Sequence, residues 1–159
     1  MSIFKIVGAL LLGLGGASCA YLSCQQASYA LRQAEGWLSL VRFVRTQVDC
    51  FSLPLPQILQ RIDPSCLRAC GYRGEEVPRS LSALLSSCEI CDREVGRIAE
   101  RFAGDFGKGY REEQLRSCDL YCELLSERRD ALAEQLPAKK RVSSTLWISG
   151  ALATVILLV

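Results

Sequence analysis

The chain has 159 residues, half of them apolar, with 19 basic residues, 17 acidic residues, nine cysteines and no histidine. The near balance of charge excludes the basic surface that a nucleic-acid-binding domain needs. The lack of histidine removes the commonest general base and metal ligand, and the odd number of cysteines excludes a disulfide framework that pairs them all.

The first predicted element is a hydrophobic helix at the N-terminus. Residues 6–24 read IVGALLLGLGGASCAYLSC and carry no charge. A helix needs about 20 apolar residues to cross the ~30 Å hydrocarbon core of a bilayer, so we predict a transmembrane helix over residues 4–25. The alternatives are a cleaved signal peptide with Lys5 in its basic region, and a lipoprotein attached at Cys19.

Residues 26–141 hold every charged residue except Lys5, and their apolar positions recur at spacings of three and four. This is the helical period, so we predict an all-α fold in which five to six helices pack as a bundle. Three apolar stripes carry the prediction: Leu31, Ala34, Leu38, Val41 and Val48; then Leu81, Leu84, Cys88, Cys91, Val95, Ile98 and Phe102; then Leu115, Cys118, Cys122, Leu125, Arg129, Leu132 and Leu136.

Proline and glycine mark the breaks between these helices. The segment Leu53–Pro56 ends the first helix and begins a short one over 56–62, and Asp63 before Pro64 caps another that stops near Gly71.

Further breaks follow along the chain. Residues 75–78 open the next helix, with Pro78 in its first turn. A turn precedes the last helix of the bundle, and Pro137 separates that helix from a basic flank. The turn contains Gly104, Gly107 and Gly109.

Residues 142–159, VSSTLWISGALATVILLV, form a second uncharged run, which we predict to be a transmembrane helix. Basic residues flank both hydrophobic segments on the side of the central domain. They are Arg32, Arg42 and Arg45 after the first segment, and Lys139, Lys140 and Arg141 before the second. Because basic flanks stay in the cytoplasm, we expect a two-pass protein of the cell membrane with residues 26–141 inside and both termini across the membrane. The alternative is an exported domain held by a C-terminal tail anchor.

Six of the nine cysteines fall in three closely spaced pairs, of which Cys88 and Cys91 have the CxxC spacing of redox sites. Both lie on an apolar stripe, where a free cysteine behaves as a small hydrophobic residue. We therefore expect core cysteines, no cofactor, no metal and no enzyme activity. The alternative is a membrane-anchored binding or redox module, in which the pairs Cys66/Cys70, Cys88/Cys91 and Cys118/Cys122 carry zinc or a dithiol.

Arg128 and Arg129 are further candidates for an interaction surface, facing solvent, anionic lipid or an acidic partner. Arg129 occupies an apolar stripe, so pairing with a carboxylate such as Glu94 or Asp119 is the alternative for that residue.

Several local motifs resemble one known family. They are Leu31-Arg32-Gln33 at the start of an amphipathic helix, Pro54-Leu55 before a short helix, Phe106-Gly107-Lys108-Gly109 followed by Arg111-Glu112-Glu113-Gln114, and the aliphatic tail with Leu146-Trp147-Ile148-Ser149-Gly150. With a membrane helix at each end, the chain resembles stage III sporulation protein AB.

That family is similar to the inner-membrane platform protein of type II secretion and type IV pilus systems. The resemblance implies a non-enzymatic scaffold in a channel-like complex between mother cell and forespore. It also implies that the chain sits in the mother-cell membrane around the forespore, beside a cytoplasmic ATPase and other membrane subunits.

Overall fold

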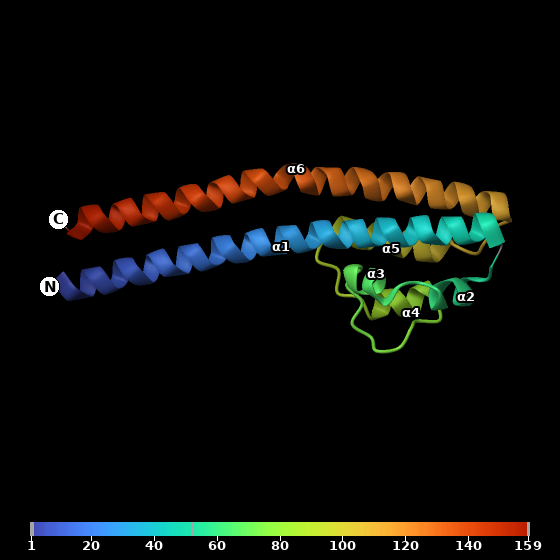
Figure 1. The fold of residues 1–159 in the computed structure, drawn as a ribbon. Helices are drawn as coiled ribbons and strands as arrows, with labels where there is room; N and C mark the ends of the chain where they lie inside the picture. The colour runs from blue at the N-terminus through green and yellow to red at the C-terminus, as the bar shows by residue number, and fades with distance from the viewer. Residues whose placement is uncertain (1, 52, 159) are drawn as a thin grey trace. The chain divides into compact units, whose positions relative to one another are not determined.

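The computed structural model describes the backbone of residues 2–51 and 53–158 and the side chains of residues 22, 24–51 and 53–137. Over this part of the chain the predicted all-α fold class is confirmed, because six helices account for the regular structure and only an isolated bridge joins Tyr72 to Cys88. The helices are α1 (Ser2–Phe51), α2 (Leu55–Gln60), α3 (Pro64–Ala69), α4 (Leu81–Ser86), α5 (Arg93–Asp105) and α6 (Arg111–Leu158), as drawn in Figure 1.

The chain divides into two compact units. One contains residues 1–28 and 133–159, and the other, which we call the bundle, contains residues 29–132. Where side chains are described, no helix combines the length and the apolar character that crossing a membrane requires. The transmembrane helices predicted over 4–25 and 142–159 lie almost entirely outside those residues, so both spans and the domain boundaries stay predictions.

Helix α1 is the central element of the bundle. Its stripe of Ala34, Leu38, Val41 and Val48 is buried as predicted. A second set of α1 residues, Trp37, Leu40 and Val44, is also fully buried. The reason is that α6 packs along one side of α1 and the short helices α2–α4 cover another side (Figure 1).

Helices α2 and α3 begin and end within two residues of where the sequence predicts. The Asp63 carboxylate accepts a hydrogen bond of 2.7 Å from the Ser65 amide, which caps α3, and Gly71 follows α3 with a φ of +95°. Helix α3 lies so close to α1 that a Cβ on Gly36 would stand 2.6 Å from the Ala69 carbonyl carbon. A side chain at Gly36 would therefore push α3 away from α1.

The apolar stripe from Leu81 to Phe102 is not one helix. Helix α4 begins after an N-cap at Ser80, not at Pro78, and ends at Ser86. Helix α5 begins after Asp92, whose carboxylate accepts hydrogen bonds from the amides of Glu94 and Val95. The helical period continues across the loop because both helices turn an apolar face to the same core.

That loop is held to α1 by one buried amide side chain. Gln33 is fully buried; its Nε2 donates to the Glu89 carbonyl, and its Oε1 accepts from the Cys91 amide at 2.8 Å. Trp37 on the next turn donates from Nε1 to the Cys70 carbonyl at 3.2 Å. Gln33 and Trp37 thus supply hydrogen-bond partners to backbone groups that have none within a helix.

Helices α5 and α6 pack through an aromatic cluster. The ring of Phe102 lies 5.4 Å from those of Phe106 and Tyr121, and the Tyr121 hydroxyl donates to the Asp105 carboxylate. Burial and the neighbouring carboxylate raise the pKa of Tyr121 to about 12. The prediction that Pro137 ends this helix is wrong, because Pro137 lies inside α6. A proline inside a helix removes one hydrogen bond but does not always end the helix.

Candidate interaction surface

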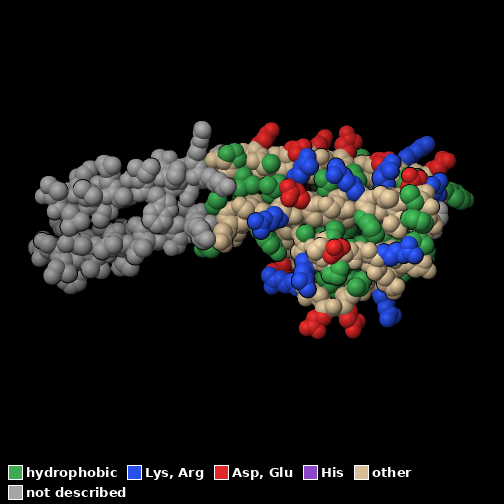
Figure 2. Space-filling view, in the orientation of Figure 1, with side chains coloured by type: hydrophobic (Ala, Val, Ile, Leu, Met, Phe, Trp, Pro, Cys, Tyr) green, Lys and Arg blue, Asp and Glu red, His purple; other side chains and the backbone are tan. Residues whose placement is uncertain are grey.

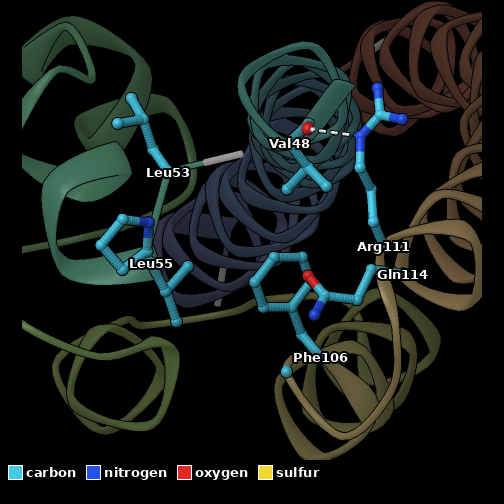
Figure 3. A pocket seen from close by; sticks show the side chains of 8 residues that line it. Val48, Leu53, Leu55, Phe106, Arg111 and Gln114 are labelled. Atoms are coloured by element: carbon cyan, nitrogen blue, oxygen red, sulfur yellow. Dashed lines mark hydrogen bonds between the residues drawn. The ribbon is translucent and has the colours of Figure 1, made fainter. Parts of the chain in front are cut away.

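A groove opens at the end of the bundle where α1 ends and α6 begins. Its volume is about 360 Å³, and Figure 3 shows its lining from α1, the α1–α2 connection, the α5–α6 turn and the start of α6. The lining residues are Val48, Leu53, Pro54, Leu55, Phe106, Gly107, Arg111 and Gln114. Most of these residues are apolar, so the groove suits an apolar side chain of a partner.

Arg111 fixes one wall of this groove. Its Nε donates to the Val48 carbonyl at 3.3 Å, drawn as a dashed line in Figure 3, and its Nη2 donates to the Asp49 carboxylate at 2.7 Å. A guanidinium that binds a carbonyl and a carboxylate together is held in one orientation. Arg111 therefore ties the first turn of α6 to the last turns of α1.

The wall next to Arg111 depends on the glycine-rich turn predicted between α5 and α6, while Leu53 and Leu55 lie across the groove (Figure 3). Gly107 has a φ of +88°, a conformation that L side chains rarely adopt, and nothing lies within 4 Å of where its Cβ would be. Gln114 donates from Nε2 to the Gly109 carbonyl at 2.9 Å and so closes the turn onto α6. The groove thus has a fixed backbone on two sides.

Two aromatic side chains stand exposed next to the groove residues in the chain. Phe51, the last residue of α1, is 60% exposed, and Tyr110, directly before Arg111, is 86% exposed. We call these two residues and the groove the tip surface. Exposed aromatic residues beside an apolar groove are typical of protein–protein contact sites.

Charges of both signs alternate over the face of the bundle in Figure 2, with hydrophobic side chains between them. No field of one sign dominates that face, which agrees with the balanced charge of the sequence. A partner that bound the tip surface would therefore meet apolar contacts with a charged rim, not a charged field.

The arginines predicted from the sequence as interaction candidates do not form one cluster. Arg32 and Arg42 are exposed on α1, and Arg45 donates to the carboxylate of Asp119 on α6, which raises the pKa of Arg45. The side chains of Lys139, Lys140 and Arg141 lie outside the described residues.

Arg128 and Arg129 have carboxylate partners. Arg128 binds both oxygens of Asp92, at 3.0 and 2.7 Å, so it serves packing of α6 on α5. Arg129 donates to the adjacent Asp130 at 2.6 Å. The alternative considered for Arg129, pairing with Glu94 or Asp119, is not found, because its carboxylate partner is Asp130. Arg129 also donates to the Ser126 hydroxyl of its own helix at 3.3 Å.

The cysteines fit the core interpretation in part. Cys70 and Cys118 are fully buried, whereas Cys91 is exposed in the α4–α5 loop. Burial raises the pKa of Cys88 to about 11, so this thiol stays protonated at neutral pH, unlike the thiolate of a redox site. Within the side chains that the structure describes, no three cysteine or acidic residues gather as a metal ion would require.

Comparison with known proteins gives the family. The model of the stage III sporulation protein AB family matches residues 5–159. The chain belongs to this family. Membership confirms the resemblance drawn from the local motifs and implies a role in sporulation. A search of curated proteins and a search of solved structures each returned no match.

Sequence reasoning missed two features of this family member. The buried Gln33 was not recognised as a structural amide, although an amide flanked by buried alanine on α1 is a signal for such a role. The tip surface was also missed, because its residues come from three separated segments that no periodicity connects.

Proposed function

We propose that this chain is a non-enzymatic membrane scaffold, the platform-like subunit of a sporulation channel complex, and that its tip surface docks a cytoplasmic secretion-type ATPase. Family membership over residues 5–159 supports the sporulation role. The observation that carries the docking step is the tip surface, where exposed Phe51 and Tyr110 lie within two residues, along the chain, of side chains that line an apolar groove.

The mechanism is positional. The uncharged segments 6–24 and 142–159 anchor the chain in the mother-cell membrane around the forespore, and their basic flanks keep the bundle in the cytoplasm. Because the bundle is anchored at both ends of the chain, it presents the tip surface to its partner in a fixed orientation. Such a scaffold needs complementary shape and a few strong contacts, and it needs no catalytic group.

The construction of the tip surface supports docking by a rigid face. Arg111 joins α1 to α6, and Gln114 closes the α5–α6 turn, so the groove is formed before a partner arrives. A preformed site loses less conformational entropy on binding than a flexible one. The exposed rings of Phe51 and Tyr110 supply large apolar area at low entropic cost.

The test is recovery of the secretion-type ATPase with the full chain, solubilised from membranes of sporulating cells in a mild detergent. Replacing Phe51 and Tyr110 by serine removes two exposed anchors, each of the kind that contributes about 2 kcal/mol in measured interfaces, and should lower recovery by more than tenfold. Leu120→Ser is the matched control, because Leu120 is 53% exposed on α6 away from the groove. Recovery that is unaffected by the double variant, or equally affected by the control, contradicts docking at the tip surface.

A further inference from the structure

A second groove lies between α1 and α3 and shares no residue with the tip surface. Its volume is about 550 Å³. Its polar lining side chains are Tyr29, Arg32, Glu35 and Ser39 from α1 and Ser65 and Arg68 from α3. We call it the α1–α3 groove.

The floor of this groove is rigid. Gly36 allows the backbone of Ala69 to touch α1, and the Cys66 thiol lies 3.9 Å from the Gly36 carbonyl oxygen. The Trp37 indole, one residue further, holds the end of α3 through the Cys70 carbonyl. The helix backbones that carry the two rims of the groove are therefore held at a fixed separation.

The charge of the groove is positive. Arg32 and Arg68 are exposed, and in the part of the chain that the structure describes neither makes an ion pair. The arginines at positions 45, 111, 128 and 129, by contrast, each bind a carboxylate. Two guanidinium groups across one groove fit the oxygens of a phosphate group, and Glu35 supplies a single carboxylate beside them.

The groove lies early in the bundle. Tyr29 follows residue 25, the end of the predicted transmembrane segment, by only four residues of the same helix α1. Four residues of a helix rise about 6 Å, which is within the headgroup layer of a bilayer. Tyr29 is 44% exposed, and tyrosine is enriched at this level of membrane proteins.

We propose that the α1–α3 groove binds the headgroup of an anionic glycerophospholipid of the phosphatidylglycerol type. Arg32 and Arg68 take the phosphate, and Glu35, about one helical turn from Arg32, accepts hydrogen bonds from the glycerol hydroxyls. This site rests on the proposed function in one respect, because it requires the first hydrophobic segment to lie in the membrane. Its role is to fix the bundle against the inner leaflet, so that the tip surface faces the cytoplasm.

The test is lipid binding by the full chain, purified in a neutral detergent and followed by native mass spectrometry. Phosphatidylglycerol, phosphatidylcholine and inorganic phosphate are titrated separately. Each arginine near an anionic lipid surface contributes about a fivefold gain, so Arg32→Gln with Arg68→Gln should weaken phosphatidylglycerol binding about thirtyfold. Arg61→Gln with Arg79→Gln is the matched control, since both arginines are exposed and lie outside the groove.

Unchanged phosphatidylglycerol binding by the variant with Arg32→Gln and Arg68→Gln would overturn the proposal. Three further results would also overturn it. One is equal loss of phosphatidylglycerol binding in the control variant, which indicates a general charge effect. Another is equal binding of phosphatidylcholine, and the third is binding of inorganic phosphate as tight as that of the lipid. A second readout is alkylation of Cys66, which lines the groove and should slow when phosphatidylglycerol is bound.

Failure here is distinguishable from failure of the proposed function. If the chain spans the membrane and recovers the ATPase while the arginine variants bind phosphatidylglycerol normally, only the lipid site is wrong. If the chain does not enter the membrane, both proposals are wrong.

Discussion

The contact between Asp92 and Arg128 offers the sharpest test of how the bundle is held together. Asp92 accepts hydrogen bonds from the amides of Glu94 and Val95, which caps α5, and from two nitrogens of Arg128 on α6. Its side chain is 13% exposed and that of Arg128 is 27% exposed. One carboxylate therefore both begins a helix and joins it to its neighbour.

The expected loss of stability separates into two parts. Asp92→Asn keeps a side-chain oxygen that can cap α5 but removes the negative charge that binds Arg128. Because charge-assisted hydrogen bonds contribute about 1.5–3 kcal/mol, we expect the free energy of unfolding to fall by about 1.5 kcal/mol. Asp92→Ala also removes the cap, which contributes about 1 kcal/mol, and should cost about 2.5 kcal/mol.

The assay is urea unfolding of the full chain in detergent, followed by circular dichroism, under reducing conditions. A double-mutant cycle of Asp92→Asn and Arg128→Met should give a coupling energy of about 1 kcal/mol or more. Additive effects of the two substitutions would refute the reasoning, because they would show that the pair contributes nothing beyond its separate parts.

The same pair predicts a dependence on pH. Arg128 and the α5 amides lower the pKa of Asp92 from its ordinary value of 3.8. A carboxyl whose pKa is lowered on folding stabilises the protein above its unfolded pKa and loses that effect as the pH falls through its folded pKa. The difference in unfolding free energy between the wild type and Asp92→Asn should therefore be constant near neutral pH and shrink below about pH 4.

Three further predictions follow from the packing. Gly36→Ala should destabilise the bundle by about 1–3 kcal/mol in thermal unfolding, because the added Cβ meets the backbone of Ala69. Gly104→Ala is the control: its Cβ meets nothing within 4 Å, so the substitution should be neutral or stabilising. Equal effects of the two substitutions would contradict the close approach of α3 to α1. Gln33→Leu leaves two partly buried backbone groups, the Glu89 carbonyl and the Cys91 amide, without their side-chain partner, so we expect a loss of about 1–3 kcal/mol and faster hydrogen exchange at the Cys91 amide. Burial raises the pKa of Cys118 to about 12, so in native protein its alkylation should be far slower than that of exposed Cys91. Similar alkylation rates would contradict the burial of the apolar stripe of α6.

Much of the fold was predictable because it depends on local chemistry. The Asp63-Pro64 cap, the glycine turn at Gly107 and the end of α1 after Phe51 each follow from backbone preferences of single residues. The break between α4 and α5 was not predictable from the apolar stripe. It depends on Gln33, which lies 58 residues before Cys91, and periodicity contains no information about such long-range hydrogen bonds.

In the candidate site too, local features were predictable from the sequence and long-range packing was not. Charged residues were easy to single out in the sequence, yet Arg128 and Arg129 turned out to have carboxylate partners. Phe106-Gly107 and Arg111 were noticed as motifs of the family, but their place at one groove with Val48 depends on the antiparallel packing of α1 and α6. Which side chains share a surface is decided by packing between segments distant in sequence.

The central claim, that the bundle is held in the cytoplasm by a membrane helix at each end, is tested most directly by thiol labelling in cells. Cys91 is exposed in the α4–α5 loop, so a variant that keeps Cys91 as its single cysteine reports the location of the bundle. The account predicts that a membrane-impermeant maleimide labels Cys91 only after the membrane is permeabilised, and that the chain stays with the membrane after alkaline washing. Labelling of Cys91 in intact cells, or release of the chain by the wash, would contradict it.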